Sequence, residues 1–433
     1  MAATSDRLTI AHLLRRTGFG PTAAEVDAAV TKGYDAVVGD LLDTSKADPA
    51  DAVPPPQFAP NEPAGQRNLT PAQRQAINQQ RGKELAALQS WWLNRMATTG
   101  RPLREKLTFF WHDHFATSYV KVRRADYLYQ QNELFRTMGM GPFEDLTQAV
   151  AKDPAMLLWL DAATDKKAHP NENFAREMME LFVLGIGNYT EDDVREAARA
   201  FTGWYVNPRT GAWAMAKAQH DDGQKTFLDQ TGPWTGEQVI HIAVNAAPSA
   251  PFIVSRIWSH FATPVTPGDA VVGDLAPGFA RDRDIAGLMR RMLLDERFVS
   301  AESRTGLVKQ PVEWLVGALR ALGLPANGPR LIAGLRLLGQ VPFEPPNVGG
   351  WPQNEYWVTT ASSLARLNLA AALANQADLA SINAVSPSGR TDAVAHLLSV
   401  AWSDETARGL DLASANPKEL VTLALVAPEF VLA

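Results

Sequence analysis

The chain is built from helical hydrophobic patterns that glycine and proline break at short intervals. Apolar residues recur three and four positions apart through most of the sequence, a spacing that places them on one face of an α-helix. Few segments alternate polar and apolar residues as a strand in a substantial sheet would. We therefore expect a mainly α fold, a multi-helix single globular unit with a small irregular or β-hairpin insert.

Changes in composition divide the expected helices into five stretches. Gly18, Gly20 and Pro21 interrupt two helical patterns, at 8–17 and 23–42, and so predict a helical hairpin. The stretches are 1–45, this hairpin; 46–71, a Pro-rich excursion without periodicity; 72–205, a central helical region; 206–234, the irregular insert; and 235–433, a C-terminal helical region. We expect them to form one compact unit.

Composition limits the chemistry that the chain can perform. The absence of cysteine excludes disulfides, thiolate metal sites, cysteine nucleophiles and covalent haem attachment. The 41 basic and 47 acidic residues are mixed along the sequence, which argues against nucleic acid as a partner. No uncharged apolar segment approaches the roughly 18 residues of a membrane span, and the first residues lack the features of an export signal. We therefore expect a soluble, cytoplasmic protein.

Common catalytic signatures are missing from the sequence. There is no Gly-x-Ser-x-Gly elbow, no phosphate-binding Walker loop, no Gly-x-Gly-x-x-Gly after a strand and no His-Glu-x-x-His. These absences weigh against a serine hydrolase, a nucleotide-binding protein and a zinc protease of that type.

The segment from Asn171 to Trp204 carries a column of polar side chains. At roughly 100° per residue, Asn173, Glu177 and Glu180 share one sector of a helix. One interpretation is an exposed ion-pair ladder, in which Arg176 pairs with carboxylates four residues away. The other is one wall of a polar site, because apolar residues fill the rest of the helix and imply that it is central. Buried carboxylates would then need cations, donors or a divalent metal.

Two histidines near residue 112 are candidate partners for these carboxylates. His114 lies in line with Leu103, Leu107 and Phe110, so it should point into the protein, either as a core histidine held by one hydrogen bond or as a ligand or general acid/base. His112 lies about half a turn away, where a surface side chain is the simpler interpretation. The candidate metal ligands are His112, His114, Glu177 and Glu180.

The expected insert contains a second polar cluster, His220 followed by Asp221, Asp222 and Gly223. Adjacent imidazole and carboxylate groups could bind a divalent cation or orient one another for proton transfer. An Asp-Asp-Gly sequence also forms a turn without any further role.

Several motifs, in order along nearly the whole chain, resemble a bacterial family catalogued as domain of unknown function 1800. They are His12-Leu-Leu-Arg-Arg-Thr-Gly-Phe-Gly20, Leu107-Thr-Phe-Phe-Trp-His-Asp-His-Phe115, Asp153-Pro-Ala-Met156, Leu160-Asp161, Asn171-Glu-Asn-Phe-Ala-Arg-Glu177, Glu180-Leu-Phe182, Phe201-Thr-Gly-Trp204, His220-Asp221 and Pro345-Pro-Asn-Val-Gly-Gly-Trp-Pro352. The resemblance implies a mostly helical fold and no established activity. Members are often encoded beside a sulfatase-like protein, and many carry export signals.

Together these observations support two functional hypotheses. The first is a hydrolase or lyase for a polar, glycan-like substrate. In it Glu177, Glu180, His114, His220 and Asp221 would be catalytic, and Asn173, Arg176, Trp351 and Trp357 would bind substrate, the tryptophans as an aromatic wall. Tryptophans also serve as core anchors, which is the alternative for Trp351 and Trp357. The second hypothesis is a non-catalytic helical scaffold or partner of the sulfatase-like protein.

Overall fold

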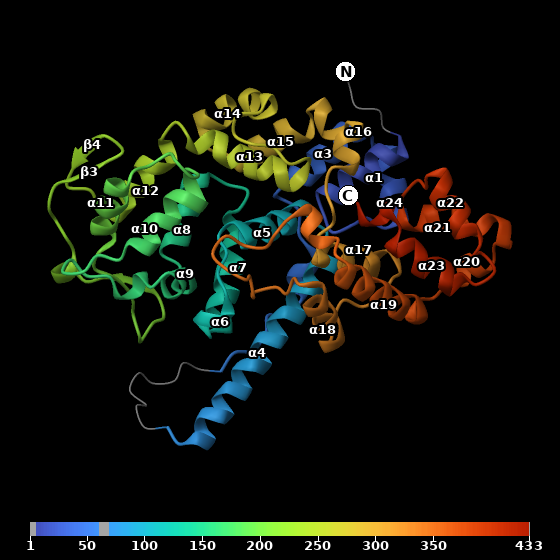
Figure 1. The fold of residues 1–433 in the computed structure, drawn as a ribbon, viewed down its shortest axis with the longest axis horizontal. Coiled ribbons are helices and arrows are strands. Elements are labelled where there is room, and N and C mark those ends of the chain that lie inside the picture. The colour runs from blue at the N-terminus through green and yellow to red at the C-terminus, as the bar shows by residue number, and fades with distance from the viewer. Residues whose placement is uncertain (1–5, 60–68, 433) are drawn as a thin grey trace.

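A computed structural model describes residues 6–59 and 69–432 and shows the mainly α fold that the sequence predicts (Figure 1). The first half contains α1 (Arg7–Arg16), α2 (Ala23–Lys32), α3 (Tyr34–Leu42), α4 (Pro71–Thr98), α5 (Pro102–His114), α6 (Tyr119–Val122), α7 (Ala125–Met138), α8 (Phe143–Ala151), α9 (Pro154–Trp159), α10 (Glu172–Glu177) and α11 (Glu191–Phe201). The second half contains α12 (Gly236–Asn245), α13 (Ser249–Phe261), α14 (Ala270–Asp282), α15 (Ile285–Leu293), α16 (Ala301–Thr305), α17 (Pro311–Ala321), α18 (Pro329–Leu338), α19 (Thr360–Gln376), α20 (Ala380–Asn383), α21 (Arg390–Leu398), α22 (Asp404–Asp411), α23 (Pro417–Val426) and α24 (Pro428–Val431).

The predicted insert folds as two small antiparallel sheets. Strands β1 (Trp204–Val206) and β2 (Trp213–Met215) form one pair, and β3 (Lys225–Phe227) and β4 (Gln230–Gly232) form the other. The first half of the Pro-rich excursion includes one turn of 3₁₀ helix, Pro49–Ala52, while its residues 60–68 lie outside the described part of the chain.

Side-chain caps fix where several helices begin. Thr22 and Thr190 each accept a backbone N–H three residues on, and the acidic side chain there bonds back to the cap residue. Gly33, at a φ of 84°, divides the single helix expected over 23–42 into α2 and α3. That expectation was wrong because apolar periodicity continues across the glycine although the backbone direction does not.

Helix α5 is buried around its whole circumference and joins two hydrophobic clusters. Phe110 belongs to the cluster formed with α1–α3 and α7–α15, whereas Phe109 belongs to the cluster formed with α4 and α17–α24. In Figure 1, α5 lies between these two groups of helices. Because no face of this helix meets water, each polar side chain on it needs a partner inside the protein.

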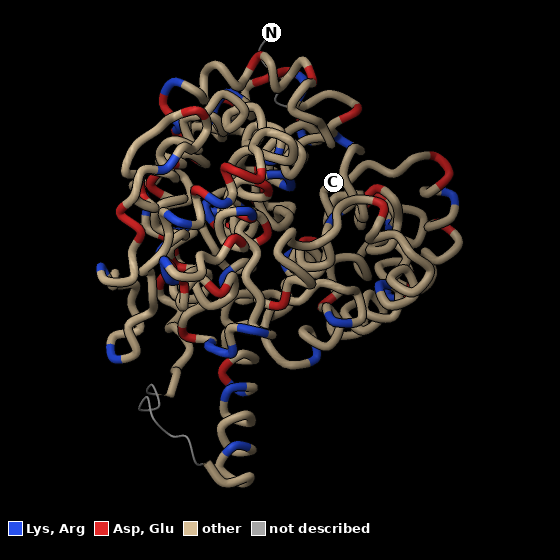
Figure 2. Tube along the Cα trace, turned by 60° about the vertical axis from the view of Figure 1, so that its left-hand side comes forward, with Lys and Arg blue, Asp and Glu red and all other residues tan. Residues whose placement is uncertain are grey.

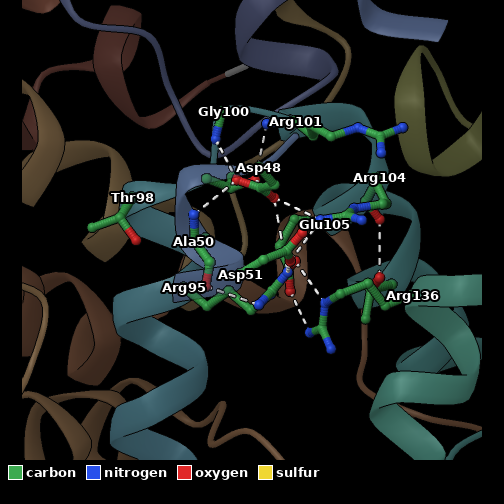
Figure 3. A network of polar contacts seen from close by, with 12 residues as sticks. Asp48, Ala50, Asp51, Arg95, Thr98, Gly100, Arg101, Arg104, Glu105 and Arg136 are labelled. Carbon is green, nitrogen blue, oxygen red and sulfur yellow. Dashed lines mark hydrogen bonds and ion pairs between the residues drawn. The ribbon is translucent and has the colours of Figure 1, made fainter. Parts of the chain in front are cut away.

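One such polar side chain is Glu105, the centre of a buried network of charges (Figure 3). Its carboxylate accepts hydrogen bonds from Arg136 at 2.6 Å, from Arg95 at 3.1 Å and from the Trp92 indole at 2.6 Å. Arg95 also pairs with Asp51 of the 3₁₀ turn. The network therefore ties α4, α5, α7 and the 3₁₀ turn together.

Charges of both signs are interspersed along the trace (Figure 2). Helix α4 stands out from the body in the same view, and its exposed side chains run from Pro71 to about Glu84. Within the described residues, no helix is both long and apolar enough to cross a membrane.

Candidate functional site

The end of α5 places three consecutive polar residues in the core, each bonded to a different segment. The His112 Nε2 atom accepts the backbone N–H of Phe343 at 3.0 Å. The Asp113 carboxylate accepts the N–H of Trp351 at 2.8 Å, and the His114 Nε2 atom lies 2.9 Å from the carbonyl oxygen of Phe182, to which it donates. Burial lowers the pKa of both imidazoles to about 3, so both are neutral near pH 7.

These contacts correct one expectation and reveal a residue that the sequence did not indicate. The surface interpretation of His112 was wrong, because the side chain lies against Trp92 and Phe343 and is only 1% exposed. Asp113 was missed altogether. Burial raises the pKa of this carboxyl group to about 6, although the Trp351 N–H opposes the shift. A Cβ atom at residue 350 would lie 2.2 Å from the Asp113 carboxylate, which explains Gly350 there.

The polar column lies on the outer side of its helix. Beyond Glu177 the helix widens into a π-helical segment, Met178–Val183, which changes the angular spacing on which the projection relied. Glu180 accepts a hydrogen bond from the Tyr189 hydroxyl, and the pKa of the half-buried Glu177 is raised by burial and by Glu180. Asn173 is exposed. Glu177 and Glu180 are therefore neighbours, as expected.

Arg176 lies in the exposed ion-pair ladder that was one of the two interpretations of this segment. It pairs with Glu191 at 2.7 Å and with Glu172 at 3.3 Å. The proposed histidine partners do not join the carboxylates, because His112 and His114 bond to backbone atoms. Over residues 6–59 and 69–432, no three His, Asp or Glu side chains are grouped so as to hold a metal ion, and the predicted ligands His112, His114, Glu177 and Glu180 are not assembled into one.

His220 and Asp221 hold the insert against α11. The His220 Nδ1 atom lies 2.8 Å from the carbonyl oxygen of Thr202, and Asp221 accepts a hydrogen bond from Arg199 at 2.8 Å. This bond with Arg199 lowers the pKa of Asp221 to about 2. The Lys225 ammonium donates to the Asp221 backbone carbonyl at 2.5 Å. Through these hydrogen bonds, His220, Asp221 and Lys225 stabilise the turn.

The tryptophans of the loop over 345–357 are anchors rather than an aromatic wall. Trp351 is 5% exposed and Trp357 is 3% exposed, so neither offers a face to a sugar. The wall interpretation failed because the Gly349–Gly350 turn folds the loop onto α5, where Trp351 contacts His112. The loop also carries Gln353 and Asn354 to the edge of a pocket that the sequence did not predict.

This pocket, which we call the basic pocket, is small, with a volume of about 30 Å³, enough for about two water molecules. It lies where the end of α1, the middle of α5, the end of α13 and the start of α17 meet. Its lining residues are Arg15, Arg16, Gly18, Phe19, Gly20, Lys106, Ser259, His260, Leu307, Val308, Lys309, Gln310, Glu313, Gln353 and Asn354.

Positive groups outnumber negative ones in the basic pocket. Lys106 pairs with Glu313, the carboxylate among the lining residues. Arg16 donates to the carbonyl of Ser303, and Lys309 donates to the carbonyl of Phe430 at 2.6 Å. Those partners are neutral, so they satisfy hydrogen bonds without cancelling charge.

Burial of these cations is reflected in their pKa values. Burial lowers the pKa of Arg15 to about 10 and that of Arg16 to about 9. Burial, reinforced by the charge of Arg15, holds the pKa of Lys309 well below its ordinary value. The His260 imidazole has a pKa of about 3 because of burial and the nearby Lys106. Burial at this pocket therefore favours forms with less positive charge, and a nearby negative charge would oppose that effect.

A second hollow, of about 390 Å³, also borders the Gly18–Gly20 turn, and three of its four cations are paired with carboxylates. Lys32 and Lys46 both pair with Asp40, and Arg320 pairs with Glu25. The basic pocket differs from this hollow because its arginines have no carboxylate partner among the residues that the structure describes. We therefore take the basic pocket as the candidate functional site.

The fold and the pocket define a multi-helix protein with a cationic pocket between α1, α5, α13 and the start of α17. Residues 12–432 match the family model described as "Protein of unknown function (DUF1800)", and the chain belongs to that family. No curated protein and no solved structure matches the chain.

The sequence carried a signal for part of the basic pocket. The family-like motif that begins at His12 includes Arg15, Arg16 and the Gly18–Gly20 turn, all of which line it. Lys106, Lys309 and Glu313 lay in no quoted motif, and their meeting depends on how distant helices pack. The sequence therefore indicated the part of the pocket that α1 and the following turn form, and only the structure showed the residues that line the rest of it.

Proposed function

We propose that this protein binds the anionic group of a polar ligand in the basic pocket. The observation that carries the proposal is that Arg15, Arg16 and Lys106 line the pocket together with a single carboxylate, that of Glu313. Cations taken out of water are costly unless an opposite charge compensates them. An anionic ligand would supply that charge, and its interaction with the cations would be strong because little water screens it.

The substrate class expected from the sequence, a polar glycan-like molecule, agrees with this site when the glycan carries an anionic group. Glu313 and His260 provide a carboxylate and an imidazole at the pocket, so hydrolase or lyase chemistry would use them in place of Glu177, Glu180 and His114. A sulfatase-like partner, expected from the family resemblance, would act on anionic esters and so share this ligand class.

The test measures how anions raise the melting temperature of the protein. Sodium sulfate and sodium phosphate are compared with sodium chloride at equal ionic strength, so that general screening is the same in every sample. We expect the multivalent anions to raise the melting temperature of the wild-type protein by several degrees and to raise that of Lys309→Met much less.

Lys32→Met is the matched control, because Lys32 belongs to the second hollow and is paired with Asp40. We expect it to keep the full response to anions. An equal response in wild type and Lys309→Met would contradict the proposal, and so would equal effects of chloride, sulfate and phosphate on the wild-type protein.

A further inference from the structure

The second hollow has the size and the lining of a small-molecule site. Its volume of about 390 Å³ falls within the range of about 300–1,000 Å³ that is usual for ligand pockets. Its walls come from the end of α1 and the turn after it, from α2 and α3, from the junction of α4 with α5, and from the end of α17. Leu14, Ala28, Leu41 and Pro102 are apolar lining residues that are partly or fully exposed, so a ligand can contact them.

The charged side chains of the second hollow leave an excess of one positive charge. Four cations and three carboxylates line it, and three of the cations pair with carboxylates. The fourth cation is Arg101, which forms no ion pair among the residues that the structure describes. A ligand with one negative charge would therefore balance the hollow.

Arg101 also has hydrogen-bond donors to spare. It donates to the carbonyl oxygens of Asp43 at 3.1 Å, Thr44 at 3.0 Å and Lys46 at 3.3 Å. A guanidinium group carries five N–H donors, so at least two have no acceptor in the described part of the chain. Asp43 and Lys46 line the hollow too, which places the guanidinium at its edge. Figure 3 shows the same group turned away from the network around Glu105.

We propose that the second hollow binds a small aliphatic monocarboxylate, of the kind represented by a medium-chain fatty acid. The carboxylate pairs with Arg101, because a planar guanidinium suits a bidentate contact with two oxygens. The hydrocarbon body lies against the accessible apolar side chains and leaves water there. This site goes beyond the proposed function and is separate from the basic pocket, with which it shares only the lining residues Gly18–Gly20.

The first experiment varies the charge of the ligand. Octanoate, octanol and octylammonium share one hydrocarbon chain and are negative, neutral and positive near pH 7. Isothermal titration calorimetry measures their binding to the full-length protein. We expect octanoate to bind at least about tenfold more tightly than octanol, and octylammonium to bind most weakly. Equal binding of octanoate and octanol, or tighter binding of octylammonium, would overturn the proposal.

The second experiment varies the length of the chain in butanoate, hexanoate and octanoate. Each CH₂ group that the hollow removes from water should tighten binding about threefold to fourfold. Octanoate should therefore bind on the order of a hundredfold more tightly than butanoate. An affinity that does not depend on chain length would overturn the role of the apolar lining.

Two matched variants on α2 locate the site. Ala28→Trp places a large side chain in the hollow, whereas Ala24→Trp places the same side chain at an exposed position of α2 that does not line it. We expect Ala28→Trp to weaken octanoate binding at least about tenfold and Ala24→Trp to leave it unchanged. Circular dichroism checks that both variants fold. Equal octanoate affinity in the two variants would place the ligand elsewhere and overturn the proposal.

Arg101→Met tests the contact with the carboxylate. It should bring the affinity of octanoate down to that of octanol, while octanol binding stays the same and shows that the hollow is intact. An unchanged preference for octanoate would overturn the role of Arg101. If octanoate does not bind and Ala28→Trp dissociates a dimer in analytical ultracentrifugation, the hollow covers a second copy of this chain and the proposal is overturned.

Discussion

At the scale of single residues, the core contains charges whose partners are built into the fold. Glu105 is fully buried between Arg95 and Arg136, and its carboxylate also accepts from the Trp92 indole. Replacing one member of such a group leaves the others buried and uncompensated, and this costs more than the intact group contributes. Its role is therefore structural, in contrast to the unmatched charges of the basic pocket.

We predict that Glu105→Gln lowers the free energy of unfolding by about 3–5 kcal/mol, because the guanidinium groups of Arg95 and Arg136 would lose the buried carboxylate between them and keep only partners at the edge of the network. Urea denaturation followed by circular dichroism measures the change. The exposed Glu355 provides the control, and Glu355→Gln should change stability by less than about 0.5 kcal/mol. A small effect of Glu105→Gln would mean that the network adjusts around the amide.

Asp153 should make stability depend on pH. Burial raises the pKa of this carboxyl group to about 7, although it accepts from the N–H of Met156 and from Gln131. A pKa that is higher in the folded than in the unfolded state stabilises the protein at low pH. That contribution is complete below about pH 4 and is lost as the pH rises through about 7.

We expect the loss between about pH 4 and pH 7 to be on the order of 2–4 kcal/mol. Asp153→Asn keeps an N-cap side chain and removes the titration, so the stability difference between wild type and variant should follow this pH range. Urea denaturation across the range measures both proteins. A constant difference at every pH would show that Asp153 titrates alike in the folded and unfolded protein.

Single residues also show what local sequence could indicate. The line of Leu103, Leu107, Phe110 and His114 correctly placed His114 inside the protein, because helical spacing is a local property. The same reasoning placed His112 at the surface, since it assumed that α5 has a solvent face. A helix that is buried all round has no such face, and the packing that buries it comes from distant segments.

At the scale of elements, the widened turn of Met178–Val183 joins the candidate column to α5. The Phe182 carbonyl near the end of this π-helical segment receives the His114 hydrogen bond. The sequence predicted the helix and the neighbouring positions of Glu177 and Glu180. It did not predict the π-helical geometry, because the positions of apolar residues alone do not distinguish five-residue from four-residue hydrogen bonding.

We predict that His114→Phe lowers the free energy of unfolding by about 1–3 kcal/mol. The phenyl ring can keep the stacking on Phe110, but the buried Phe182 carbonyl would lose its donor. The control is His396→Phe on the surface of α21, where we expect little change. Urea denaturation measures both variants, and equal stability of His114→Phe and wild type would argue that the hydrogen bond contributes nothing net.

At the scale of the whole molecule, the first and last parts of the chain are joined. Arg15 donates to the carbonyl of Ser399 at 2.7 Å, and the backbone N–H of Lys309 donates to the carbonyl of Val431 at 2.9 Å. The basic pocket forms where these distant segments meet. Local periodicity predicts helices but not which helices pack together, so the pocket could not be assembled from the sequence.

Only the inner half of helix α4 is packed against the rest of the molecule. It spans 28 residues, about 42 Å at the usual rise per residue. Its side chains are mostly exposed as far as Glu84, and buried positions begin at Leu85. The outer stretch, from Pro71 to Glu84, is about as short as isolated helices that are only marginally stable in water, so it should open far more often than the inner half.

We therefore predict that trypsin cleaves after Arg74 and Arg81 in the outer half of α4 well before it cleaves after Arg95 in the inner half. Arg95 is 4% exposed and held by Glu105, so it serves as a control within the same helix. Mass spectrometry of a digestion series gives the order of cleavage. If Arg74 and Arg81 survive as long as Arg95, the outer half of α4 is held by contacts with a second molecule in solution, because its own chain provides few.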